Sequence, residues 1–316
     1  MASEMEWVMV GNPSNPPDAL TGCGAVARSF AIAKHEVTVE QYAAFLTAVA
    51  ARDPHGLWNA GQKIDRGGKE GAYTYVARPG HEREPVMNVS FLDAMRFANW
   101  MHHSHNFAAG AAIDSAATTP AAGAADVSRI TETGAYDLAV GGGLAARSPA
   151  ARVWIPSEDE WYKAAYHHPH AAGGPPGGYW RFPTRSDTPP ALGPPGDAGT
   201  NLASFLADTT LLQNLTTKRG YDDVMPVGSF PRSTSYFGTL DQAGNAWEWV
   251  ETIIFDTQRI MRGGCMCATY EWFLPQVRSN ARPHRRYKDL GFRVARAVPT
   301  EMAAPAAPPP TPQSTP

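Results

Sequence analysis

Three segments repeat apolar residues at helical spacing, and each follows a polar residue that can cap a helix. In each, a glutamine, aspartate or glutamate three positions on can complete a capping box. The pairs are Thr38 with Gln41, Ser90 with Asp93, and Ser157 with Glu160. The pattern therefore predicts helices that begin at about residues 39, 91 and 158.

Short apolar runs between turn residues predict strands. These runs are 29–37, 152–155, 225–230, 246–250, 259–264 and 290–298. Strands and helices in this order, joined by long irregular segments, indicate a single α+β domain over residues 1–298. Within it we expect an exposed Ala-rich insertion at about 107–128 and a Gly/Pro-rich loop at about 170–200. The Pro/Ala-rich residues 299–316 are expected to be a disordered tail.

Composition narrows the functional classes. An apolar content of 43% supports a real core, whereas a net charge of −3 gives no electrostatic case for nucleic acid. No apolar run is long enough to span a bilayer. The N-terminus lacks a signal-peptide pattern, so the chain as written is expected in the cytoplasm, or outside the cell if a signal was removed. Three cysteines are too few for a disulfide framework.

Six motifs occur in one order along the chain. They are "HEVTVEQYAAFL", "PVMNVSFLDAMRFANWM", "RVWIPSEDEWYKAA", "GTLDQAGNAWEWVET", "RIMRGG" and "LGFRVAR". Together they resemble the formylglycine-generating enzyme (sulfatase-modifying factor) family. The resemblance implies a single, loop-rich domain of C-type-lectin-like topology that is often stabilised by calcium.

The resemblance also implies a calcium site in "DQAGNAWE". Its ligands would be Asp241, Gly244, Ala246 and Glu248, through two carboxylates and two backbone carbonyls. The alternative is a metal-free turn in which Glu248 pairs with an arginine. A second calcium site would involve Asn201 and Asp222, or the adjacent Asp223.

Two cysteines lie one residue apart after the "RGG" motif. Family enzymes hold copper with two cysteines and convert a sulfatase cysteine to an aldehyde, but the matching positions here are Ala268 and Phe273. The standard activity is therefore not expected. If the segment is a strand, however, Cys265 and Cys267 point the same way and can clamp copper(I). That alternative is a family oxidoreductase acting on a protein or peptide.

The segment 265–288 mixes aromatic, methionine and basic residues, as contact surfaces do. We expect this segment to bind a peptide, protein or glycan ligand through seven of its side chains: Met266, Tyr270, Trp272, Phe273, His284, Arg285 and Tyr287. The preferred interpretation is a calcium-stabilised, non-catalytic recognition module. Arg262 and Arg293 are expected to form framework ion pairs.

Two histidine clusters follow predicted helices. They are His102, His103 and His105, and His167, His168 and His170. Nothing in the sequence brings the two clusters together, so no shared metal site is predicted. The ligand and the oligomeric state are not determined by the sequence.

Overall fold

The three predicted helices form at their capping motifs. They are α1 (Val39–Val49), α2 (Phe91–His103) and α5 (Glu158–Tyr166). All three capping boxes are present, with each side chain bonded to the other residue's backbone N–H. The computed structural model describes residues 4–103, 124–196, 199–205 and 224–298.

Within the described residues, ten short strands form three sheets. Their bounds are β1 Trp7–Val10, β2 Phe30–Ala33, β3 Ile64–Gly67, β4 Thr74–Ala77, β5 Val153–Trp154, β6 Trp247–Ile254, β7 Gln258–Arg262, β8 Ser279–Ala281, β9 Leu290–Phe292 and β10 Ala295–Arg296. The strand orders are β1-β2-β10-β5, β3-β4 and β8-β7-β6-β9. Most pairs are antiparallel, but β6 and β9 run parallel, with Trp247 opposite Leu290.

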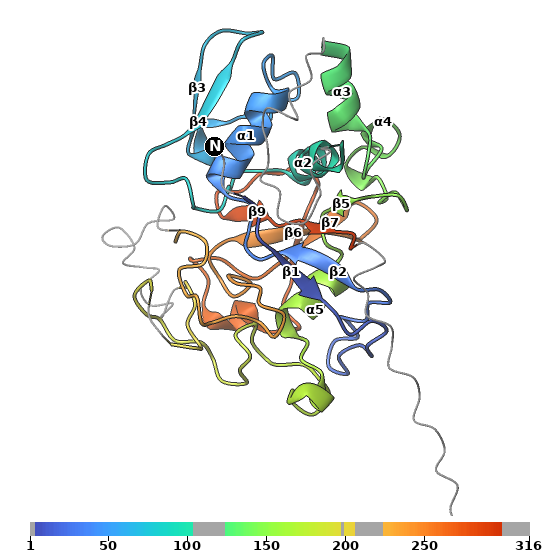
Figure 1. Ribbon diagram of the computed structural model, residues 1–316, viewed down its shortest axis with the longest axis vertical. Coiled ribbons are helices and arrows are strands. Elements are labelled where there is room, and N and C mark those ends of the chain that lie inside the picture. Colours follow the sequence, from blue (N-terminus) through green and yellow to red (C-terminus); the bar gives the residue numbers. More distant parts are fainter. Residues whose placement is uncertain (1–3, 104–123, 197–198, 206–223, 299–316) are drawn as a thin grey trace, which may run out of the picture.

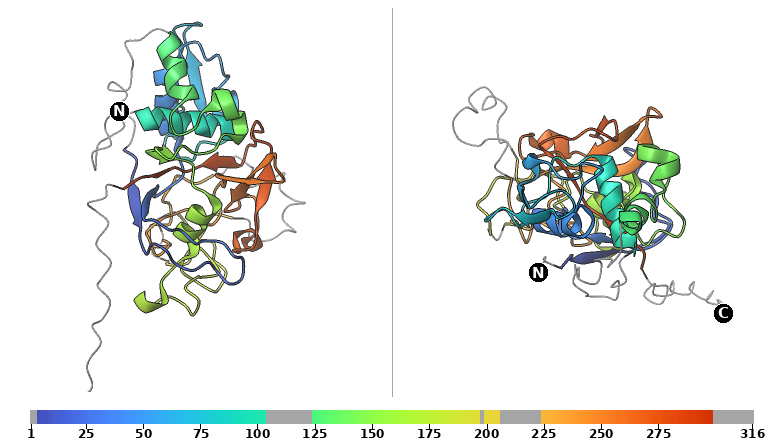
Figure 2. Two further views of the ribbon diagram at one scale, coloured as in Figure 1. Left: turned by 90° about the vertical axis from the view of Figure 1, so that its right-hand side faces the viewer. Right: turned by 90° about the horizontal axis from the view of Figure 1, so that it is seen from above.

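The two four-stranded sheets lie in the middle of the molecule (Figure 1). Helices α1 and α2, together with the β3–β4 hairpin, lie on one side, whereas α5 and long loops lie on the other (Figure 1). A perpendicular view shows the same division (Figure 2). Phe45, Phe97 and Trp100 on the two helices pack against one another and, through Phe97, against Phe292 of β9. This aromatic cluster joins the helical layer to the sheet that carries the candidate site.

Two sequence predictions about the fold are wrong. Residues 124–128, the end of the predicted insertion, begin helix α3 (Ala124–Glu132), whose Glu132 pairs with Arg96 of α2. The run 225–230 forms turns instead of a strand. The rest of the insertion, 107–123, and the tail 299–316 lie outside the described residues. The short helices α4 (Leu138–Gly141), η1 (Ala60–Gln62), η2 (Gly142–Leu144), η3 (His170–Ala172) and η5 (Tyr270–Phe273) were not predicted.

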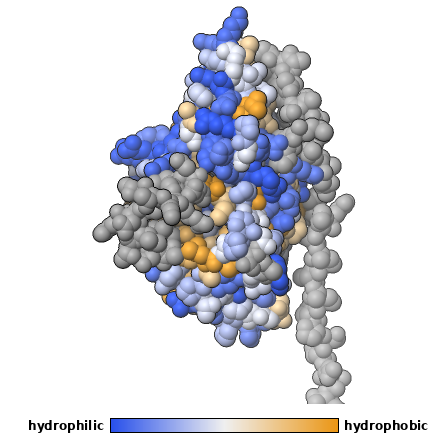
Figure 3. All heavy atoms as spheres, turned by 90° about the vertical axis from the view of Figure 1, so that its left-hand side faces the viewer, coloured by the Kyte–Doolittle hydropathy of each residue, from blue (hydrophilic) through white to orange (hydrophobic). Residues whose placement is uncertain are grey.

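The described part of the Gly/Pro-rich segment 170–200 is irregular, as predicted. It contains η3 and isolated bridges, such as Phe182 with Ser186, but no longer element. The face on the left of Figure 1 is mostly hydrophilic, with apolar residues gathered near its centre (Figure 3). Among the described residues, none of the helices has both the length and the apolar character needed to cross a membrane.

Candidate functional site: a cleft beside two cysteines

A glycine pair turns the chain away from the sheet after β7. Gly263 and Gly264 have φ angles of 98° and 72°, which residues with a Cβ rarely adopt. A Cβ on Gly264 would also lie 2.7 Å from the ring of Phe273. The "RGG" motif therefore lets the following residues leave the sheet and pack closely against the η5 segment.

Residues 265–268 form a turn, so the strand on which the copper(I) alternative was conditional is not formed here. The Ala268 N–H donates to the Cys265 carbonyl oxygen at 2.9 Å, and the Met266 N–H donates to the Asn245 carbonyl oxygen at 2.9 Å. The turn brings the sulfur atoms of Cys265 and Cys267 together as a disulfide. Cys265 is buried, whereas Cys267 is partly exposed.

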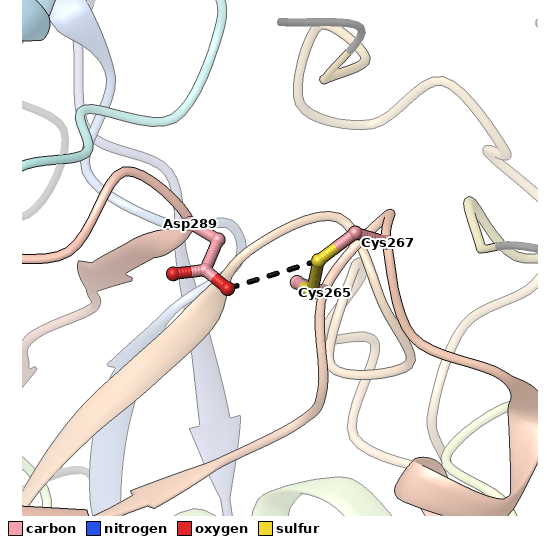
Figure 4. A group of neighbouring side chains, drawn as sticks. All are labelled: Cys265, Cys267 and Asp289. Carbon is pink, nitrogen blue, oxygen red and sulfur yellow. Dashed lines mark hydrogen bonds between the residues drawn. A yellow bond between two sulfur atoms is a disulfide. The ribbon is translucent and has the colours of Figure 1, made fainter. Parts of the chain in front are cut away.

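Asp289 lies beside this disulfide. Its Oδ2 atom is 3.7 Å from Cys267 Sγ, and the side chains of the two cysteines and the aspartate converge in Figure 4. A disulfide sulfur carries no hydrogen, so this contact becomes a hydrogen bond only when Cys267 is a thiol. Burial raises the pKa of Asp289, and the neighbouring Lys288 charge opposes that shift.

The pair borders a cleft of about 460 Å³. Its lining residues come from strands β6 to β9, the turn, η5 and the segment just before β9: Trp247, Met261, Cys265, Cys267, Ala268, Trp272, Ser279, Asn280, Tyr287, Asp289 and Leu290. The Trp247 N–H donates to the Asp289 carbonyl oxygen at 2.8 Å. This bond fixes the aspartate against the start of the long strand β6.

Aromatic side chains form part of the cleft wall. The Trp247 and Trp272 rings meet edge to face, with centroids 5.7 Å apart and planes at 84°. Trp272 is 45% exposed and Tyr287 is 42% exposed. The wall therefore combines one tryptophan fixed in the core with two aromatic side chains open to solvent.

Only part of the predicted contact set faces this cleft. Trp272 and Tyr287 line it, whereas Tyr270, His284 and Arg285 do not belong to its lining. Met266 and Phe273 lie in the core and are not part of the cleft lining. Phe273 is fully buried against Phe205, with ring centroids 5.6 Å apart.

Asp289, Met261, Ser279 and Asn280 line the cleft without having been predicted from the sequence. Asp289 immediately precedes β9 in "KDLGF", a place that carries no chemical signature of its own. Its proximity to the cysteines results from the parallel pairing of β6 and β9. Only that long-range contact could have revealed it.

The expected framework ion pairs of Arg262 and Arg293 are confirmed. Arg262 Nε lies 3.1 Å from Glu158 Oε1. Arg293 donates to both oxygens of Glu248, at 2.6 and 2.7 Å, and both side chains are fully buried. Trp161 Nε1 also donates to Glu248 Oε2, at 2.8 Å.

Two further carboxylates surround this ion pair. Asp241 Oδ2 accepts from the Gly228 N–H at 2.7 Å, and burial raises the pKa of Asp241 to about 6. Burial, with Asp241 and Glu248 nearby, raises the pKa of Glu36 well above its ordinary value. Glu36 Oε1 accepts from Asn245, but Oε2 is buried without a hydrogen-bond partner.

The described histidines of the two clusters contact residues outside the strands. His103 contacts the Thr133 carbonyl oxygen at 2.8 Å, and His102 Nδ1 accepts from the Arg152 N–H. His167 contacts Asn12 and the Gly178 carbonyl oxygen, and burial lowers its pKa to about 4. His168 stacks on Tyr236, and His170 contacts the Gly174 carbonyl oxygen. His105 lies outside the described residues.

Across the ranges that the structure describes, the one group of metal-ligating side chains is Cys265, Cys267 and Asp289.

The protein is thus a loop-rich α+β domain whose surface cleft is bordered by strands β6 to β9. Residues 21–298 match the family model described as "Sulfatase-modifying factor enzyme 1-like domain". The chain belongs to this formylglycine-generating enzyme and sulfatase-modifying factor family.

Several solved structures are similar to this chain, and one of them, with a TM-score above 0.5, shares the fold. The structure titled CarF has 19% identity and a TM-score of 0.56, over 93% of this chain and 99% of that chain. PvdO from Pseudomonas aeruginosa has 20% identity and a TM-score of 0.46, over 93% and 92%. Treponema denticola variable protein 1 has 18% identity and a TM-score of 0.49, over 93% and 95%. No match was found among curated proteins.

Domains of this family often bind calcium, but the predicted first site does not fit the ion as it is folded. Glu248 Oε2 already accepts from Arg293 and Trp161, and Oε1 accepts from Arg293, so calcium would have to share this carboxylate with a buried guanidinium group. This pairing matches the metal-free alternative. For the second site, Asn201 Oδ1 accepts from Thr184 at 2.5 Å, whereas Asp222 and Asp223 lie outside the described residues.

Proposed function

We propose that this domain is a recognition module that binds a peptide segment of a partner protein in the cleft beside Cys265 and Cys267. The cleft carries the proposal: about 460 Å³ of space bordered by two exposed aromatic side chains and one buried tryptophan. Concave sites with aromatic walls and a few polar groups are typical of ligand binding. In this proposal, the Glu248–Arg293 ion pair braces the scaffold in place of calcium.

The positions that match the family's catalytic cysteines support a non-catalytic role. Ala268 lines the cleft, and its methyl group offers no metal ligand or nucleophile. Phe273 is fully buried in the core. The standard copper chemistry of the family therefore lacks both of its thiols at their usual places.

The chemistry of the wall favours an apolar or aromatic side chain on a peptide backbone. Trp247, Trp272 and Tyr287 supply aromatic surface, while Ser279 and Asn280 supply hydrogen-bonding groups. Asp289 supplies an acceptor at one edge. An extended peptide combines all the matching groups, because its amides pair with the polar side chains while one side chain fills the cleft.

Selection from a phage-displayed library of random peptides tests this proposal. We expect peptides rich in aromatic residues that bind the wild type and not Trp272→Ala. Phe255→Ala is the matched control, because Phe255 is a 70% exposed aromatic residue outside the cleft lining. Peptides that bind all three proteins equally would contradict the proposed cleft.

A second candidate function is an oxidoreductase that uses Cys265 and Cys267. It is favoured by one observation: the turn brings both sulfur atoms together at the wall of the cleft. When reduced, two thiolates are suitable soft ligands for copper(I). Titration of the reduced protein with copper(I) against a competing chelator tests it. Stoichiometric binding that Cys265→Ser abolishes would favour this candidate.

A further inference from the structure

Three donor atoms, two sulfurs and one carboxylate oxygen, gather at one wall of the cleft. The sulfurs of Cys265 and Cys267 and a carboxylate oxygen of Asp289 all lie within 4.8 Å of one another (Figure 4). All three residues line the same 460 Å³ cleft. Any ion that they hold would therefore have a coordination position facing the ligand space.

We propose that reduction of the Cys265–Cys267 disulfide creates a zinc site with Cys265, Cys267 and Asp289 as its protein ligands and with its fourth position open to the cleft. The disulfide form cannot bind the ion, since its sulfurs have no thiolate charge. The site is thus controlled by the redox state of the cysteine pair.

The observed spacing suits zinc. Zinc binds thiolate at about 2.3 Å and carboxylate at about 2.0 to 2.2 Å, so a sulfur and an oxygen at tetrahedral positions lie about 3.5 Å apart. Cys267 Sγ and Asp289 Oδ2 are 3.7 Å apart. The two sulfurs must separate to about 3.8 Å, the corresponding spacing of two thiolates on one zinc ion. Breaking the disulfide frees both side chains for that movement.

The mixed donor set favours zinc over calcium and copper(I). Calcium prefers six to eight oxygen ligands, and only one of these three residues supplies oxygen. Copper(I) prefers soft sulfur ligands and gains little from a carboxylate, whereas zinc accepts both sulfur and oxygen. Three protein ligands with one open position are the arrangement of reactive zinc sites. Asp289 is therefore the residue that distinguishes zinc from copper(I).

The redox step balances with an external thiol. A thiolate attacks one cysteine sulfur, the disulfide bond breaks, and the other cysteine leaves as a thiolate. A second external thiolate then attacks the mixed disulfide, which releases the oxidised external disulfide and the second cysteine thiolate. Overall, two external thiols lose two electrons and two protons to the cysteine pair. Zinc then binds the two thiolates in place of their protons.

Zinc titration of the full-length chain tests the proposal. The protein is reduced, freed of reductant without oxygen, and titrated with zinc against a chromophoric chelator. We expect one equivalent of zinc on the reduced protein and none on the oxidised protein. Cys265→Ser and Cys267→Ser should each lose this binding. Asp289→Asn should weaken it by at least about tenfold, the lower range for loss of even an outer-shell partner.

Two controls keep the test decisive. Cys23→Ser should bind zinc as the wild type does, because Cys23 lies outside the cleft lining. Mass spectrometry of the wild type should show that zinc protects Cys265 and Cys267 from alkylation, a readout that does not depend on folding of a variant. Three results would overturn the proposal: absence of zinc binding, equal zinc affinity in Asp289→Asn, or binding of copper(I) alone that ignores Asp289.

Discussion

Arg293 donates hydrogen bonds to both carboxylate oxygens of Glu248, and both side chains are completely buried. The same guanidinium group also donates to the carbonyl oxygens of Ala33, Lys34 and Leu240. Arg293 directly follows β9, and its hydrogen bonds link that strand to β6, to the end of β2 and to the loop before β6. Every N–H of a buried guanidinium group needs a hydrogen-bond partner, because an unpaired charge inside a protein raises the free energy of the folded state.

Removing one member of this pair should therefore destabilise the domain strongly. We expect Glu248→Gln to lower the free energy of unfolding by roughly 3–5 kcal/mol, because Arg293 would remain as a buried, unpaired charge. Urea unfolding measures the effect. The matched control is Asp65→Asn, which breaks the exposed Arg78–Asp65 pair and should change stability little. Equal effects of the two substitutions would contradict the bracing role of Glu248.

Calcium should not be needed for the stability of this brace. Because Arg293 uses both oxygens of Glu248, we expect the melting temperature of the wild type to be unchanged by chelator or by added calcium. Differential scanning fluorimetry measures this. A chelator that lowers the melting temperature of the wild type, and not that of Glu248→Gln, would restore calcium to the site.

Glu251 should make stability depend on pH. Burial raises its pKa from 4.5 to about 7, despite the opposing charge of Arg147. As pH rises between these values, the unfolded chain loses this proton first, so the folded state loses relative stability until about pH 7. We expect the stability of the wild type relative to Glu251→Gln to fall between about pH 4.5 and about pH 7.

Glu132→Gln is the control for that pH effect. Burial is the largest single influence and raises the pKa of Glu132, but the hydrogen bond and charge of Arg96, together with His55 and Thr131, outweigh it and lower the pKa below 4.5. Its stabilising effect is lost only in acid, so the difference between wild type and Glu132→Gln should stay constant over the same pH range. A constant difference for Glu251→Gln as well would show that Glu251 does not titrate there.

Phe273 and Trp272 are adjacent but should behave differently. Phe273→Ala removes a fully buried ring and should lower the free energy of unfolding by about 3–5 kcal/mol. Trp272→Ala removes a side chain that is 45% exposed, so its cost in stability should be clearly smaller. Chemical denaturation of both variants measures the difference. Similar losses would place Trp272 in the core and weaken its role in the cleft.

Local chemistry made the helices predictable from the sequence. A capping box such as Thr38 with Gln41 acts within four residues, so its signal needs no knowledge of the rest of the fold. Helix α3 was not predicted because Gly, Pro and Thr interrupt the Ala-rich segment before it. The family motifs allowed the domain type to be predicted, and the family match confirms it.

The cleft and its lining residues could not be predicted from the sequence pattern, because they depend on contacts between distant segments. Alternation along a strand predicted that Cys265 and Cys267 point the same way, but the observed turn brings the sulfurs together by another route. The orientation of Phe273 depends on η5, a single helical turn without a periodic signal. Asp289 reaches the cysteines only through parallel strand pairing. Such contacts between distant segments arise from the packing of the whole domain.

The affinity of a cleft-binding peptide for Trp272→Ala tests the central claim most directly. Isothermal titration calorimetry with a peptide selected on the wild type provides the measurement, with Phe255→Ala as the control for loss of an exposed ring. We predict that Trp272→Ala weakens binding by about tenfold or more, as expected for an aromatic anchor, while Phe255→Ala binds as the wild type does. Equal affinities for all three proteins would contradict a recognition site in this cleft.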